Sequence, residues 1–249
     1  MDSNFRIKFM DLWAKYFVNA PLPVAYYYTN DKPAGEIASK TAGCFITAVL
    51  RAWKGEDIIL TRESIGCQGG VFYTGFGEMT MPNFNYFLSY GIEGKVRGER
   101  YKKTPALVDE IYAVLPKFTA PAKHIVIKRW DNLTGDDNPD VVVFFAAPDV
   151  LSGLFTLSNF DESCETNVSA PFSSGCGSIF MWPMTEKTAG GKKGYLGMFD
   201  PSARPFIPAG TLSFAITFQR FEQLVSYMEE SFLITHDWEK VKELIADRL

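Results

Sequence analysis

Short segments rich in β-branched and aromatic residues alternate along this chain with segments of helical periodicity. Strands are expected at residues 23–29, 57–61, 125–130, 141–147, 195–199 and 212–217. Helices are expected at residues 3–18, 41–53, 104–115, 148–157, 175–184, 218–230 and 237–248, with Pro183 ending the fifth of them. Because the alternation lacks a strict βαβ rhythm, it predicts an α/β (α+β) fold with a mixed sheet flanked by helices.

Composition narrows the class of protein further. The chain has 249 residues, 47% of them hydrophobic and 22% charged, which is enough for a sizeable core in a single domain spanning 1–249. The net charge is −4 and the basic residues do not cluster, so nucleic acid is not an expected partner. The N-terminal segment lacks a signal-peptide pattern, and no apolar run is long enough to cross a membrane. With four cysteines, we expect a cytoplasmic protein with reduced thiols and no disulfide scaffold.

A repeated plan suggests internal duplication. Cys44 follows a glycine at a predicted helix start, and Cys67 follows a glycine and a short strand. In the second half, Cys176 follows a glycine at another predicted helix start, and Met198 follows a glycine and a short strand. We therefore expect two related halves, 20–120 and 121–235, packed as one unit and followed by the C-terminal helix 237–248. The alternative is chance similarity between two common supersecondary units.

The same residues carry a family resemblance. Residues 44–49 (CFITAV), 59–61 (ILT) and 67–70 (CQGG) resemble the N-terminal signature of an uncharacterised family of archaea and anaerobic bacteria. That family is a domain of unknown function, also labelled the archaeal conserved region (ArCR) family. Residues 174–177 (SGCG), 197–204 and 212–216 (LSFAI) resemble its second half, so the likeness extends from about 24 to 225. The resemblance implies four cysteines, of which this chain keeps three, with Met198 in the fourth place.

The first functional hypothesis is a cysteine site. Thiols at helix starts are favoured as thiolates, and three thiolates with a thioether would suit a soft metal ion or an iron–sulfur cluster with a redox role. The predicted metal ligands are Cys44, Cys67, Cys176 and Met198. The chain contains no Cys-x-x-Cys spacing, however, so it has no zinc-ribbon or ferredoxin motif. The alternative is that Cys44 and Cys176 are small buried residues at helix–sheet contacts. Cys164 lies outside the pattern.

The second hypothesis is a cofactor-free module that binds a small, partly anionic ligand in an aromatic pocket. In the first hypothesis, Gly66, Gly69, Gly70 and Arg204 are the predicted cofactor-binding residues beside the cysteines, since glycines let a ligand approach the backbone. In the second, Arg204 pairs with a carboxylate or phosphate of the ligand. Arg62 lies beside the equivalent turn. The candidate pocket aromatics are Phe72, Tyr73, Phe76, Phe180, Trp182 and Tyr195.

A third hypothesis is a structural or interaction protein whose thiols only pack. The two histidines, His124 and His236, are too few for a histidine-ligated zinc site and stand in no catalytic pattern. No nucleotide-binding glycine motif with the correct spacing occurs. The sequence therefore predicts a site without predicting a reaction or an oligomeric state.

Overall fold

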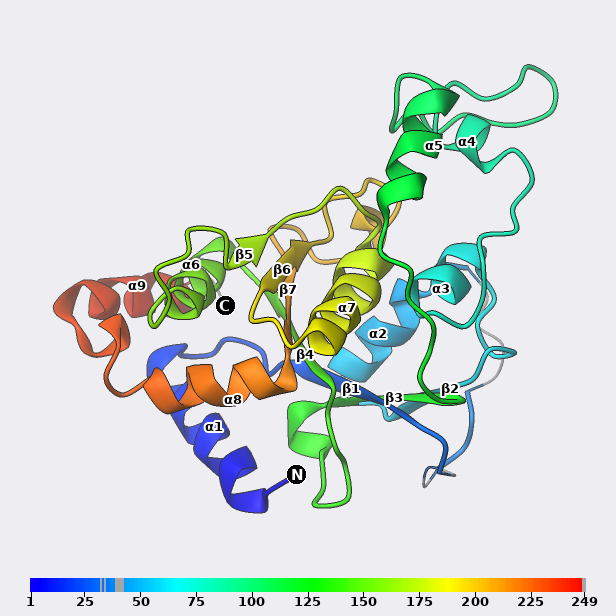
Figure 1. Cartoon of the computed structure of the whole chain (residues 1–249). Helices are drawn as coiled ribbons and strands as arrows, with labels where there is room; N and C mark the ends of the chain where they lie inside the picture. The colour runs from blue at the N-terminus through cyan, green and yellow to red at the C-terminus, as the bar shows by residue number, and fades with distance from the viewer. Residues whose placement is uncertain (32, 34, 39–42, 248–249) are drawn as a thin grey trace.

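A computed structural model describes residues 1–31, 33, 35–38 and 43–247, and its centre is a seven-stranded mixed sheet. The strands are β1 Val24–Thr29, β2 Ile58–Leu60, β3 His124–Arg129, β4 Val141–Ala146, β5 Val168–Ser169, β6 Gly194–Gly197 and β7 Leu212–Thr217. Their order is β2-β3-β1-β4-β7-β6-β5, with β5 and β6 parallel and the other neighbours antiparallel. This confirms the predicted mixed sheet flanked by helices (Figure 1).

Helices cover both faces of the sheet. They are α1 Ser3–Tyr16, α2 Ile46–Trp53, α3 Gln68–Tyr73, α4 Phe84–Phe87, α5 Pro105–Val114, α6 Pro148–Ser158, α7 Trp182–Ala189, α8 Phe218–Tyr227 and α9 His236–Ala246. A π-helical segment, Gly177–Met181, leads into α7. Short 3₁₀ turns occur at Trp130–Asn132, Arg204–Phe206 and Phe232–Ile234. Within the described residues, no helix is both long and apolar enough to cross a membrane.

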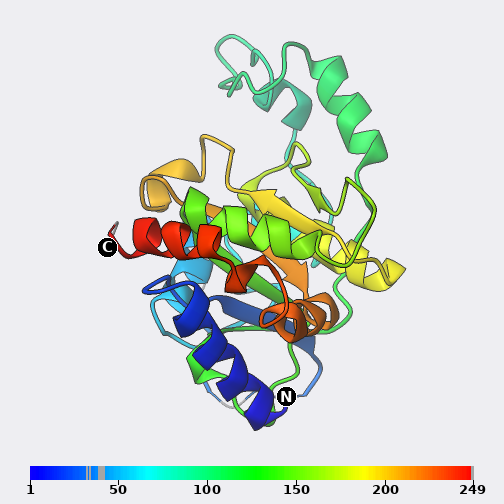
Figure 2. The same cartoon turned by 90° about the vertical axis from the view of Figure 1, so that its left-hand side faces the viewer.

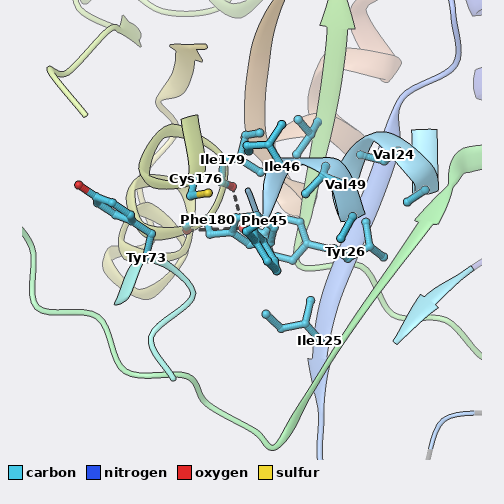
Figure 3. Close-up of a cluster of buried hydrophobic side chains, with 14 of the residues drawn as sticks. Val24, Tyr26, Phe45, Ile46, Val49, Tyr73, Ile125, Cys176, Ile179 and Phe180 are labelled. Atoms are coloured by element: carbon cyan, nitrogen blue, oxygen red, sulfur yellow. Dashed lines mark hydrogen bonds between the residues drawn. The ribbon is translucent and has the colours of Figure 1, made fainter. Parts of the chain in front are cut away.

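Strand β4 shows how the two faces are built. All six of its residues are buried, because alternate side chains point to opposite faces and both faces are covered. Val141, Val143 and Phe145 pack with α2 and α7 in one core, while Val142 and Phe144 pack with α1, α6, α8 and α9 in the other. Figure 3 shows part of the first core, where the Tyr26 hydroxyl donates a 2.9 Å hydrogen bond to the carbonyl of Ile179.

Local sequence signals explain several helix ends. The Thr104 side chain accepts a hydrogen bond from the backbone N–H of Leu107, and Pro105 occupies the first position of α5, as predicted. Pro183 does not end its helix, contrary to expectation. It lies where the π-helical segment passes directly into α7, inside a continuous helix. The carbonyl of Ile179, four residues before it, accepts a hydrogen bond from the Tyr26 hydroxyl instead, and α7 continues to Ala189.

Two other expectations are corrected in the first half. The helix expected over 41–53 begins at Ile46, and residues 41 and 42 lie outside the described residues, as does residue 248 of the expected last helix. No helix was expected between residues 61 and 104, but the glycine-rich segment 66–77 contains α3.

The strand order is symmetric about the central β1–β4 pair. Outward from β1 come β3 and β2, and outward from β4 come β7 and β6. Helix α2 follows β1, and α7 follows β4 after α6 and β5; α2 and α7 lie on the same face of the sheet. Cys44 and Cys176 thus precede corresponding helices, while Cys67 and Met198 follow corresponding strands. This arrangement is compatible with two related halves, which stay a prediction.

One long segment leaves the body of the molecule and returns to it. We call residues 76–119, which contain α4 and α5, the α4–α5 excursion; both views show it projecting from the body (Figures 1 and 2). Its two ends meet, because the backbone N–H of Ala120 donates a 2.9 Å hydrogen bond to the carbonyl of Gly75. The excursion therefore adds a wall to the α2–α7 face without interrupting the sheet.

Candidate functional site

A cavity of about 790 Å³ lies where the α4–α5 excursion meets the body on the α2–α7 face. Body residues form one side of it, among them Cys44, Ile46, Cys67, Gly69, Gly70, Tyr73, Cys176 and Ser178. Excursion residues form the opposite side, among them Met79, Met81, Phe84, Phe87, Leu88, Ile111 and Tyr112. Phe172 and Phe199 also line it, and both are 56% exposed, which places them at its mouth.

Three of the four predicted metal ligands line this one cavity. Cys44 lies just before α2, and its carbonyl accepts a 2.7 Å hydrogen bond from the Thr47 hydroxyl. Cys67 is the N-cap residue of α3, and its Sγ accepts a hydrogen bond from the backbone N–H of Gly70 at 3.1 Å. Cys176 is buried immediately before the π-helical segment (Figure 3). The structure therefore brings Cys176 to the same cavity as Cys44 and Cys67, although it follows them by more than 100 residues in the sequence.

The thiols at the helix starts do not favour the thiolate. Burial raises the pKa of Cys176 well above its usual value, and the nearby Cys67, Cys44 and Asp200 add to the effect through repulsion between like charges. Burial also raises the pKa of Cys44, outweighing the backbone N–H of Ile46, which lowers it. The expected helix-start stabilisation is thus smaller than the cost of placing a negative charge in an apolar, acidic environment.

The other predicted site residues have different positions. Gly69 and Gly70 line the cavity, whereas exposed Gly66 is not among the described lining residues. Met198 is buried behind the cavity wall with a left-handed backbone (φ 68°), and its Sδ lies beside Gly175. The Arg204 guanidinium donates hydrogen bonds to the carbonyls of Thr211 and Met198, so it holds the turn that follows β6.

Among residues 1–31, 33, 35–38 and 43–247, no group of three His, Cys, Asp or Glu side chains is placed closely enough to hold a metal ion. Cys44, Cys67 and Cys176 share a cavity without forming a ready set of ligands. The structure thus places three sulfur atoms along one cavity without arranging them as a metal site.

The thiol end of the cavity also carries polar groups. The Asp200 carboxylate accepts a 2.7 Å hydrogen bond from the backbone N–H of Gly175 and another, also 2.7 Å, from the Ser202 hydroxyl. The Ser174 hydroxyl accepts a 3.2 Å hydrogen bond from the backbone N–H of Gly177. These bonds fix the turn that positions Cys176.

Most of the aromatic lining was not predicted from the sequence. Of the six candidate pocket aromatics, Tyr73 is the one among the described lining residues, while Phe180 packs in the core and Trp182 stacks on Tyr195. The aromatic run 84–87 (FNYF) is the signal that could have indicated the excursion wall. Tyr112 completes that wall, with its hydroxyl 3.0 Å from the hydroxyl of Tyr73.

A comparison with known protein families shows which family this chain belongs to. The model of DUF169, described as an uncharacterised ArCR family, matches residues 20–227. The chain belongs to the ArCR family. That match confirms the resemblance seen in the cysteine and glycine motifs. No curated protein and no solved structure matches the chain significantly. All the cavity residues named above lie within the ArCR match, so the site is part of the ArCR region itself.

Proposed function

We propose that this protein binds a mainly apolar small molecule in the cavity, with one end of the ligand against Cys44, Cys67 and Cys176. The observation that carries the proposal is that three thiols and an apolar wall of Met and aromatic side chains line one space. A volume of about 790 Å³ lies in the range of sites that bury drug-sized ligands.

The wall chemistry supports an apolar ligand body. Met79 and Met81 are flexible and polarisable, so they adapt to an irregular shape, whereas Phe84 and Tyr112 offer flat faces. All four side chains are partly exposed although they are apolar, so a ligand that covered them would gain hydrophobic free energy.

The thiols give the other end of the ligand a distinct environment. Raised pKa values keep Cys44 and Cys176 protonated near neutral pH, so both act as small, soft, uncharged groups. These thiols suit contact with a soft or apolar atom of the ligand.

A binding experiment tests the proposal. We expect the neutral fluorescent probe N-phenyl-1-naphthylamine to gain fluorescence on titration with the protein, and Tyr112→Ala to weaken its binding about tenfold through lost aromatic contact. The matched control is Tyr90→Ala, since Tyr90 lies in the same excursion, is 52% exposed and is not among the described lining residues. A probe that does not bind, or that binds the two variants equally, would contradict the proposal.

A second candidate is the predicted thiolate site for a soft metal ion or iron–sulfur cluster with a redox role. What favours it is that Cys44, Cys67 and Cys176 share the cavity and that, after burial, repulsion from neighbouring thiolates further raises the pKa of Cys44 and Cys176. A bound soft cation would reverse that repulsion and stabilise the thiolates.

Anaerobic purification tests this second candidate. We expect stoichiometric iron and sulfide, or another soft metal, with a charge-transfer band that disappears in Cys67→Ser and persists in Cys164→Ser, because exposed Cys164 lies outside the cavity lining. Colourless, metal-free and folded protein would reject the cluster. The free state of all four cysteines supports a reducing compartment, and we propose that this compartment is the cytoplasm.

A further inference from the structure

The charged side chains of the cavity wall all carry the same sign of charge. Among the described residues that line the cavity, the charged side chains are Glu99 and Asp200, and both are acidic. Glu99 has an ion pair with Arg97 at 3.5 Å, but the Arg97 side chain is 87% exposed, so solvent screens its charge. Asp200 receives hydrogen bonds from neutral groups, the Gly175 N–H and the Ser202 hydroxyl. The formal charge of the described lining side chains is therefore negative.

The basic side chains near the cavity do not belong to its described lining. The Arg204 guanidinium is directed to two backbone carbonyls, and Arg62 is exposed. The Lys102 Nζ lies 3.7 Å from the ring centroid of Phe172 at the mouth, and Lys102 is not among the described lining residues. An anionic ligand would thus enter without a cationic partner beside it in the cavity.

The aromatic wall adds a second preference. Faces of Phe and Tyr rings attract cations, most strongly where water is excluded. Phe84, Phe87 and Tyr112 line the excursion side, and Tyr73 lies across from Tyr112. The Lys102–Phe172 contact shows the same chemistry at the rim of this site.

We infer that the ligand is a mainly apolar organic cation, an amine or quaternary ammonium compound, bound between the aromatic wall and the carboxylates of Glu99 and Asp200. The inference rests on the proposed function and sets the ligand's charge. It replaces the partly anionic ligand expected from Arg204, since that guanidinium is occupied by backbone carbonyls.

Three matched probes distinguish the claim that the cavity binds an apolar ligand from the claim that this ligand is a cation. They are dansyl amides of butylamine (neutral), of 3-(trimethylammonio)propylamine (cationic) and of 4-aminobutyrate (anionic), each titrated at low ionic strength and followed by dansyl fluorescence. We expect the cationic probe to bind about tenfold more tightly than the neutral probe, and the anionic probe to bind more weakly than either. Added salt should reduce the difference.

Two variants that replace a carboxylate by a carboxamide test which carboxylates contribute to binding of the cation. Glu99→Gln and Asp200→Asn should each lower the affinity of the cationic probe about threefold to tenfold and that of the neutral probe by a much smaller factor, and circular dichroism checks that both variants fold. Glu93→Gln is the control, because exposed Glu93 lies in the excursion outside the described lining. Equal affinity for the neutral and cationic probes overturns the inference and leaves the proposed function intact. Failure of all three probes to bind overturns both.

Discussion

The absence of a side chain at Gly153 lets helix α6 pack closely against Trp238 of α9 and against Phe17. A Cβ at this position would contact the Trp238 ring of α9 and lie 2.7 Å from Cε1 of Phe17. Glycine inside a helix otherwise costs about 1 kcal/mol relative to alanine, so a substitution here sets two effects against each other. Both rings are buried, so they cannot move aside cheaply.

We expect Gly153→Ala to lower the free energy of unfolding by about 1–2 kcal/mol, since overpacking outweighs the gain in helix propensity. Gly69→Ala in α3 is the matched control, because no described atom outside its own helix and neighbours lies within 4 Å of the added Cβ. It should leave stability unchanged or raise it by up to about 1 kcal/mol. Urea unfolding measures both, and a stabilised Gly153→Ala would contradict the packing argument.

The thiols also differ residue by residue. Cys164 is exposed, and hydrogen bonds from Thr166 lower its pKa, whereas burial raises the pKa of Cys176 well above 9.0. Because the thiolate is the nucleophile, iodoacetamide at pH 8 should modify Cys164 first and Cys176 last. Peptide mass spectrometry over time gives the order, and Cys164→Ser should remove the fast phase alone. Fast labelling of Cys176 would show that its thiol is not held protonated.

Between elements, an ion pair of buried Arg220 with exposed Asp161 joins the start of α8 to the segment after α6. Arg220 is 1% exposed; its Nη1 lies 2.8 Å from Oδ2 of Asp161, and its Nη2 donates a 3.1 Å hydrogen bond to the carbonyl of Ser158. The Arg220 side chain lowers the pKa of Asp161 from 3.8 to about 2. A lowered pKa in the folded state means that the pair stabilises the fold above pH 3.8, and that this contribution is lost as the pH falls through about 2.

We therefore expect Asp161→Asn to lower the free energy of unfolding by about 1–2 kcal/mol at pH 7. It leaves the buried guanidinium of Arg220 without a counter-charge, but solvent around exposed Asp161 screens part of the interaction. The difference from the unmodified protein should shrink as the pH falls from 4 towards 2. Urea unfolding over this pH range measures it, with Asp136→Asn in an exposed turn as the control. A difference that does not change with pH would assign the effect to packing instead of charge.

In the molecule as a whole, the α4–α5 excursion that walls the cavity contributes little to the two cores that hold the sheet. The α4–α5 excursion starts and ends at the hydrogen-bonded pair Gly75 and Ala120, and its helices bury little, with no residue of α4 and only Val108 of α5 buried. The two cores of the sheet are built from the rest of the chain, apart from the partly buried Phe76, Leu115 and Phe118.

Replacing residues 79–113 with a short Gly/Ser linker should therefore leave a cooperatively folded body, with its melting temperature changed by only a few degrees. The same change removes Met79, Phe84 and Tyr112, so binding of the neutral probe should be lost. Calorimetry and probe titration on the same preparation give both results. Loss of cooperative unfolding would show that the excursion belongs to the folding core.

Local sequence patterns were sufficient for most of the elements. The strand expected at residues 212–217 matches β7 (Leu212–Thr217), and the helix expected at 104–115 matches α5 within one residue at each end. These signals are local, because alternation, helical periodicity, Thr104 and Pro105 act over a few residues. Helix α3 was missed since Gly69 and Gly70 oppose helix formation, while its N-cap bond to the Cys67 sulfur has no common sequence signature.

The fold class, the family and the distinctive residues Cys44, Cys67 and Cys176 could be read from the sequence. That these thiols line one cavity, that Met198 lies behind its wall, and that Arg204 is held by carbonyls became clear from the three-dimensional arrangement. The difference comes from the distance along the chain over which each interaction acts. Propensity and hydrophobic period are set by neighbouring residues, whereas the cavity depends on how β1 and β4 pair and where the excursion returns, which are contacts between distant parts of the chain.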